Sequence, residues 1–190
     1  MERFKLLITL LSFILPIGSI AAPHYTSSHC DTPYYGATLS YVQITKEPEF
    51  MHGYQFMLIY DPQQFKWRQF NVYFDGGLGH FWITNRPYYR TLSIYSISPV
   101  VRYTFKKRGP VSPYIEFGIG IAYFNHLKFD DRNLGMHPTF QDKMGAGFYL
   151  GTTQQFSLGL HAVHYSNAGL SAYNHGITIP MVVDIGYRFS

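Results

Sequence analysis

The sequence predicts an all-β fold, namely an eight-stranded antiparallel transmembrane β-barrel of the bacterial outer membrane. Three observations lead to this prediction. Apolar residues alternate with small or polar ones at a period of two through much of the second half of the chain. Charged residues make up 14% of the 190 residues and aromatic residues 18%, whereas soluble domains carry about 25% charged residues. After the N-terminal stretch, no apolar run is long enough for a spanning helix.

The N-terminus has the pattern of a secretory signal peptide. A short positive start precedes an apolar stretch from Leu6 to Ile20, and Ser19-Ile20-Ala21 is a small-x-small cleavage site. We therefore expect a signal peptide over residues 1–21 and a barrel domain over residues 22–190. The single cysteine, Cys30, excludes a disulfide framework and is expected to be a free thiol.

Eight runs of residues are the predicted strands, and the first three alternate less regularly than the rest. The fifth is the clearest, since its odd positions from Ile115 to Tyr123 are large while its even positions are Glu116, glycine or alanine. The eighth alternates apolar residues with Asp184, Gly186 and Arg188. In chain order the runs are Tyr35–Lys46, Tyr54–Tyr60, Gln69–Thr84, Leu92–Phe105, Tyr114–Asn125, Gln141–Thr152, Gln155–Ser166 and Thr178–Phe189.

A narrow closed barrel explains this pattern better than a soluble sandwich. The face opposite the bulky residues is mostly glycine, alanine and a few charges, which is too small for an ordinary solvent face. In a barrel the bulky residues meet lipid, small or paired polar residues fill the interior, and closure removes the sheet edges. Four charged residues fall on inward positions, and we expect a buried ion-pair network from Arg102, Glu116, Asp184 and Arg188.

With both chain ends on the periplasmic side, the two longest connections lie outside the cell. These are residues 126–140 and 167–177, and long outer loops are typical of such barrels. The same topology places the end of the seventh strand, with His164 and Ser166, at the level of the outer leaflet.

The segment that begins at His164 has the residues of a serine esterase. His164 and Ser166 are two residues apart, so both side chains leave a strand by the same, outward face. A serine hydroxyl is a weak nucleophile until a base such as imidazole accepts its proton. The negative oxygen that then develops needs hydrogen-bond donors. Asn167 and Asn174 carry amides, and Gly169 allows a backbone N–H to approach closely.

These residues resemble the lipid A 3-O-deacylase (PagL) family, whose members are also called acyloxyacyl hydrolases. The resemblance is close over His164-Tyr165-Ser166-Asn167-Ala168-Gly169-Leu170, Asn174, Gly176 and a last strand ending Gly186-Tyr187-Arg188-Phe189. It implies that Ser166 is the nucleophile and His164 the general base. It also implies that the Gly169 N–H and Asn174 form the oxyanion hole. The implied reaction is hydrolysis of the 3-O-linked acyl chain of lipid A.

One position departs from the family pattern. The family usually has a glutamate fourteen residues after the histidine, where it orients the imidazole, and here that position is Thr178. The usual Asn-Pro-Gly is Asn174-His175-Gly176. Thr178 or a backbone carbonyl could orient His164, or the serine and histidine could work slowly as a dyad. The alternative function is a catalytically impaired or non-enzymatic structural outer-membrane barrel.

Other functional classes receive little support from the sequence. The net charge of +4 comes from dispersed Lys and Arg residues, which does not favour nucleic acid. His161 and His164 are three apart and would face opposite sides of a strand, so we expect neither metal nor another cofactor. A soluble lipocalin-like carrier is a further alternative. The expected partners are the membrane and lipopolysaccharide, and the sequence leaves a homodimer open.

Overall fold

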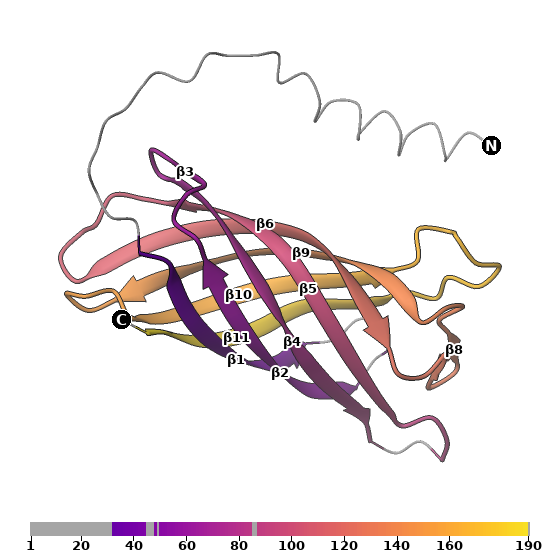
Figure 1. The fold of residues 1–190 in the computed structure, drawn as a ribbon. Helices are drawn as coiled ribbons and strands as arrows, with labels where there is room; N and C mark the ends of the chain where they lie inside the picture. The colour runs from indigo at the N-terminus through magenta and orange to yellow at the C-terminus, as the bar shows by residue number, and fades with distance from the viewer. Residues whose placement is uncertain (1–31, 45–47, 49, 85–86, 190) are drawn as a thin grey trace, which may run out of the picture. The chain divides into compact units, whose positions relative to one another are not determined.

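Eight long antiparallel strands form a closed barrel in this protein (Figure 1). The computed structural model describes residues 32–44, 48, 50–84 and 87–189. The expected signal peptide and Cys30 lie outside the described residues. The long strands are β1 (Tyr34–Ile44), β2 (Met51–Asp61), β4 (Phe70–Ile83), β5 (Thr91–Thr104), β6 (Val111–Phe124), β9 (Pro138–Leu150), β10 (Phe156–Ser166) and β11 (Ile177–Phe189). Three short strands lie in connections: β3 (Lys66–Trp67), β7 (Lys128–Phe129) and β8 (Arg132–Asn133).

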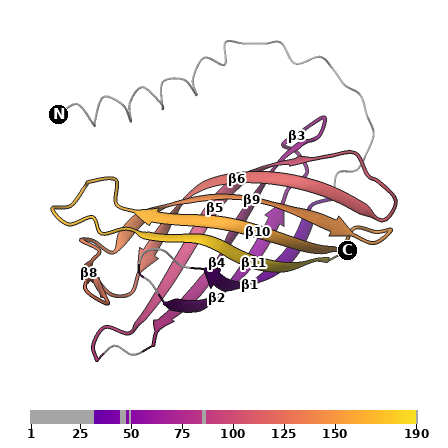
Figure 2. The same cartoon turned by 180° about the vertical axis from the view of Figure 1, so that it is seen from behind.

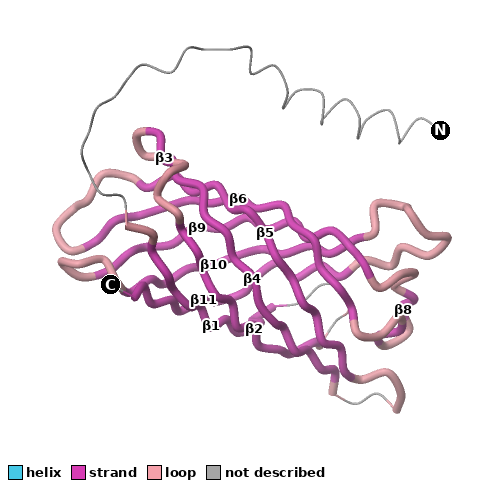
Figure 3. The backbone as a smooth tube through the Cα atoms, viewed as in Figure 1, coloured by secondary structure: helices cyan, strands magenta, loops and turns pink. Residues whose placement is uncertain are grey.

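Each long strand pairs with its neighbours, and pairing of β2 with β4 and of β1 with β11 completes the ring. The predicted eight-stranded barrel is therefore confirmed. The longest connections, which include the β7–β8 hairpin and the β10–β11 loop, emerge at one end of the barrel, as Figures 2 and 3 show. The first and last strand residues lie at the other end. Within the described residues there is no helix that is long and apolar enough to cross a bilayer.

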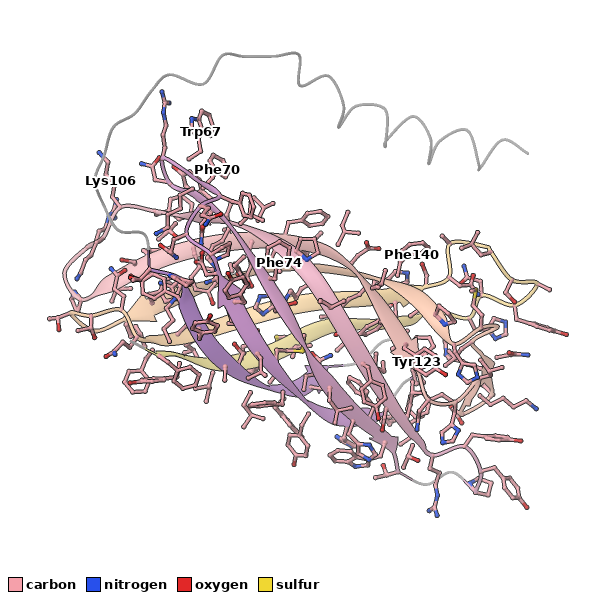
Figure 4. All side chains as sticks on the ribbon, viewed as in Figure 1. Trp67, Phe70, Phe74, Lys106, Tyr123 and Phe140 are labelled. Atoms are coloured by element: carbon pink, nitrogen blue, oxygen red, sulfur yellow. The ribbon has the colours of Figure 1, made fainter. Side chains whose placement is uncertain are left out.

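The predicted outward face is made of large exposed apolar side chains. In β6 every second residue from Ile115 to Tyr123 is exposed, and the residues between them are buried. Aromatic side chains gather toward both ends of the barrel (Figure 4): Trp67 and Phe70 at one end, Tyr123 and Phe140 toward the other. A band of apolar side chains between two aromatic girdles is the surface that a bilayer requires.

The second predicted strand is longer than its sequence pattern suggests. It begins at Met51, three residues before the predicted Tyr54, and Met51 is buried. Gly53 obscures the alternation because it is an inward position without a side chain. A Cβ atom there would collide with the ring of Phe81 on β4, so the glycine makes room for that fully buried side chain.

The half of the interior away from the long loops holds the predicted ion-pair network. Arg102 forms an ion pair with Glu116, and its Nε donates to that carboxylate at 2.6 Å. The two ring nitrogens of His161 contact Glu116 and Asp184. Lys143 pairs with Asp75 on the far side of the lumen. These contacts satisfy charges that would otherwise be buried without partners.

Arg188 was expected to pair with a carboxylate, but its hydrogen-bond partner is a tyrosine. Its guanidinium donates to the hydroxyl of Tyr149 and lies 3.9 Å from the centre of that ring. Tyr149 is an inward residue of β9 and is 2% exposed. Cation–π contact thus supplements hydrogen bonding at this end of the lumen.

We expected small or polar residues to fill the interior, and for the half near the long loops this expectation is wrong. That half is a cluster of bulky apolar side chains that continues up to the long loops. Phe129 and Leu134, from the connection that contains β7 and β8, are buried in it. The period of two shows which residues face inward, but it does not show that a long loop folds back over the barrel mouth. The cluster is Val42, Met51, Phe81, Ile83, Leu92, Ile94, Ala122, Phe124, Phe129, Leu134, Val163, Tyr165, Ile177, Ile179 and Val182.

Replacing Glu116 by Gln should destabilise the folded barrel, because Arg102 and His161 would both lose a buried carboxylate partner. Breaking a buried ion pair costs about 3–5 kcal/mol. Urea unfolding in detergent micelles, followed by the change in electrophoretic mobility, measures the difference. The exposed Lys106→Gln variant is the control and should unfold like the wild type. Equal unfolding midpoints for E116Q and K106Q would show that the network is not stabilising.

Candidate functional site

His164 and Ser166 lie on the same outward face at the end of β10, just before the long loop. Both are partly exposed, whereas Val163 and Tyr165 beside them are 3% and 0% exposed and point inward. The face continues along the strand through the exposed Leu160 and Leu158. The imidazole and hydroxyl therefore project from the wall of the barrel, as the strand period predicts.

Thr178 lies directly opposite His164 in the pairing of β10 with β11. The distance between His164 Nδ1 and Thr178 Oγ1 is 3.0 Å, a normal hydrogen bond. The hydroxyl thus occupies the place that the family pattern gives to a glutamate. Nδ1 is held by this bond, and Nε2 is the ring nitrogen that the bond leaves free.

A β-bulge in β11 gives Thr178 its outward direction. Along β11, Val182 pairs with His161 while Ile179 pairs with Val163, so β11 has one residue more than β10 over this interval. Pro180 and Met181 both point away from the core, and the inward positions change there from odd numbers (177, 179) to even numbers (182, 184). Bulges next to active sites often redirect a side chain in this way. Without the extra residue, Ile179 would face His164.

Asp142 flanks His164 from the opposite strand and was not identified from the sequence. It is the register partner of His164 on β9, and directly paired residues share a face. The sequence gives no sign of this proximity, because the two residues are 22 positions apart and only the strand register brings them together. A carboxylate thus lies on the outer wall beside the imidazole.

Gly176 packs closely against the imidazole of His164. A Cβ atom at this position would lie 3.1 Å from Cε1 of His164 and 2.6 Å from the carbonyl oxygen of Tyr165. A larger residue would therefore displace either the ring or the backbone of β10. The sequence singles out Gly176 as part of the family motif, and the structure supplies its physical reason.

The buried Asn167 organises the loop that follows Ser166. Its Nδ2 donates to the carbonyl oxygens of Leu134 at 3.2 Å and Tyr173 at 2.7 Å. Its Oδ1 accepts the N–H of Gly169 at 3.0 Å, and its own N–H donates to Oδ1 of Asn174 at 2.9 Å. The last contact turns the amide nitrogen of Asn174 away from Asn167. In this conformation the Gly169 N–H is engaged by Asn167, whereas the sequence-based expectation was that it faces an oxyanion.

An apolar groove of about 440 Å³ runs across the outer wall and ends beside this loop. Its far end reaches β5 and Gly77 of β4, and its near end contacts Asn167 and Leu170. Phe140, one of its lining residues, is the register partner of Ser166. The groove lies between outward side chains of three strands, namely Tyr95, Ile97, Ile121, Tyr123, Pro138 and Phe140.

No group of three or more potential metal ligands occurs among the described residues. His161 points into the lumen, where it contacts two carboxylates, while His164 points outward. The two histidines therefore do not share a ligand set. The outer wall and its loop thus carry a hydroxyl, an imidazole, the Asp142 carboxylate and amide donors.

Replacing Asn167 by Ala should loosen the loop without unfolding the barrel, because three side-chain hydrogen bonds disappear. Hydrogen–deuterium exchange of residues 168–176 should accelerate, while exchange in the strands stays unchanged. Asn167→Asp keeps the acceptor for Gly169 but loses the two donors, so its exchange should be intermediate. Wild-type exchange rates in N167A would contradict the organising role of this residue.

The chain matches the family model described as "Lipid A 3-O-deacylase (PagL)" over residues 35–188. Lipid A deacylase PagL of Pseudomonas aeruginosa is 44% identical over 82 residues, which are 43% of this chain and 46% of that protein. Lipid A deacylase PagL of Bordetella bronchiseptica is 41% identical over 66 residues, which are 35% of this chain and 36% of that protein. The matches thus span less than half the length of these curated relatives.

A solved structure resembles the whole barrel. The crystal structure of the outer membrane enzyme PagL aligns with a TM-score of 0.60 and 29% identity, covering 83% of this chain and 99% of that one. The family match covers most of the chain and includes every strand that builds the site. The protein is an outer-membrane β-barrel and belongs to the lipid A 3-O-deacylase (PagL) family.

Proposed function

We propose that this protein is a serine esterase that hydrolyses the 3-O-linked acyl chain of lipid A in the outer leaflet. The observation that supports this most is the outward pair His164 and Ser166, with the imidazole held at Nδ1 by Thr178. A bilayer-facing hydroxyl and base have access to a lipid ester without any passage into the barrel. Membership of the family supports the same substrate.

The reaction would proceed through an acyl-enzyme. Nε2 of His164 accepts the Ser166 proton as Oγ attacks the ester carbonyl. The negative oxygen accepts a hydrogen bond from Nδ2 of Asn174, whose carbonyl oxygen is fixed by the Asn167 N–H. The Gly169 N–H joins as second donor once it leaves Asn167. The imidazolium returns its proton to the departing sugar oxygen, and water then releases the fatty acid through the same steps.

The apolar groove suits the acyl chain of such a substrate. It starts beside the catalytic loop and is lined by aliphatic and aromatic side chains that already face the bilayer. An acyl chain there would stay in apolar surroundings while its ester reaches Ser166. The sugar and its phosphates would lie at the level of the loops, where polar groups are abundant.

Thr178 favours a slower enzyme over an inactive barrel. A hydroxyl can accept the Nδ1–H bond and fix the ring, which is the orienting part of the glutamate's role. It carries no charge, so it stabilises the imidazolium less than a carboxylate does. The impaired structural barrel stays the second candidate, and it predicts that lipid A is unchanged when the protein is overproduced.

All the proposed catalytic groups come from one chain, so this mechanism needs no homodimer. The cleaved signal peptide over residues 1–21 stays a prediction of the sequence, which leaves a homodimer open.

Expression in an outer membrane should lower the mass of lipid A by one acyl chain, and Ser166→Ala should abolish this change. The nucleophile is lost, while the exposed strand end keeps its fold. Mass spectrometry of extracted lipid A measures both. Ser171→Ala in the same loop is the matched control and should deacylate normally. Deacylation by S166A at the wild-type level would exclude Ser166 as nucleophile.

Replacing Thr178 by Val should lower kcat about tenfold with little effect on KM, the scale of one lost hydrogen bond. Thr178→Glu should raise kcat above the wild type, because a carboxylate binds the imidazolium more strongly. Asp142→Asn tests the flanking carboxylate separately. If T178V has wild-type kcat and D142N does not, Asp142 rather than Thr178 supports the imidazole.

A further inference from the structure

The segment Asn174–Gly176 contributes twice to the proposed site, and nothing in its own sequence makes it rigid. Asn174 offers the amide donor, and Gly176 forms the wall beside the imidazole. A proline between these two residues would fix its own φ angle. Here the central residue is His175, which has no such restriction.

The hairpin of β7 and β8 contacts the two residues that follow Asn174. The His175 N–H donates to the carbonyl oxygen of Asn133, and the Asn133 N–H donates to Nδ1 of His175, each at 3.3 Å. A proline could make neither bond. Nη1 of Arg132 donates to the carbonyl oxygen of Gly176 at 3.0 Å. Both residues of β8 therefore hold the segment.

The hairpin is itself anchored to the barrel. Phe129 and Leu134, on either side of β8, are 0% and 3% exposed within the apolar cluster. Gly135 has a φ of +83° and lies so close to Tyr173 and Asn167 that a Cβ atom would collide with both. The hairpin can therefore transmit the rigidity of the barrel core to the loop that it contacts.

We propose that β8 is a clamp, in which His175 and Arg132 are positioning residues that hold the oxyanion donor Asn174 and the imidazole wall Gly176 in place. The His175–Asn133 bonds restrict a segment whose own residues leave its backbone free to move. This proposal rests on the proposed function, since it assigns a role in the same site. It also gives the guanidinium of Arg132 a carbonyl partner in the loop, distinct from recognition of a lipid phosphate.

The test compares His175→Ala, His175→Gln and Arg132→Met in the full-length protein, with His126→Ala as the matched control. His126 is an exposed histidine of the same outer connection and lies outside the clamp. H175A and R132M should each lower kcat about tenfold with KM within twofold, because the donor is misplaced and the groove is intact. H175Q should recover most of the activity, since its amide oxygen can accept the Asn133 N–H. H126A should match the wild type.

Two further measurements test the clamp even if lipid A is not the substrate. The rate at which a fluorophosphonate labels Ser166 should fall with kcat in H175A and R132M, whether or not lipid A is the substrate. Hydrogen–deuterium exchange of residues 173–176 should accelerate in both variants, even if Ser166 is not the nucleophile.

Three results would overturn the proposal. Wild-type labelling and exchange rates in H175A and R132M would remove the clamp. A loss in H175Q equal to that in H175A would show that the Asn133 bond is not what His175 contributes. If R132M raised KM for phosphorylated lipid but not for lipid without phosphate, and left kcat unchanged, Arg132 would bind the lipid headgroup and not the loop.

Discussion

Closure of the backbone hydrogen-bond ladder, completed where β2 pairs with β4, is the constraint on which the rest of the structure depends. A bilayer offers no partner for an unpaired N–H or C=O, so every strand must pair on both sides. Each strand then divides its side chains between lipid and lumen. An enzyme built on such a narrow barrel, whose lumen is filled, must place its chemistry either in the loops or on the outer wall. His164 and Ser166 are on the wall, and the donors that we propose for the oxyanion are in the loop.

The two halves of the lumen support the site in different ways. The ion-pair network around Glu116 lies farther from the long loops, and the apolar cluster lies directly behind the strand end that carries His164 and Ser166. Tyr165, Ile177 and Ile179 are fully buried there, so a slip of one residue in β10 or β11 would expose them. The core residues therefore fix the register, and the register sets which side chains flank His164.

The fold was largely predictable from the sequence, because period-two alternation shows directly which residues face lipid. The outward direction of His164 and Ser166 followed from the same rule. The role of Thr178 did not follow in this way. The even-numbered residues of β11 from Val182 onward face inward, so Thr178 would be expected to face inward as well. Only the bulge at Pro180–Met181 turns it outward, and a bulge has no periodic pattern in the sequence. Asp142 was missed for a related reason, because strand register is a long-range property.

The loop contacts were also beyond the reach of the sequence. Asn167 was a candidate donor to the oxyanion, yet its side chain is buried and makes its hydrogen bonds to backbone groups of the loops. His175 differs from the family pattern, but only the position of β8 shows what the histidine contacts. Tertiary contacts between two irregular segments have no periodic signature.

The central claim is that a nucleophilic serine, activated by its neighbouring imidazole, faces the bilayer. A fluorophosphonate with a long alkyl chain, added to the folded protein in lipid vesicles, tests this most directly when the labelled peptide is mapped by mass spectrometry. The account predicts a single adduct on Ser166 that disappears when His164 is replaced by Ala. Labelling of another serine, or equal labelling without the imidazole, would contradict it.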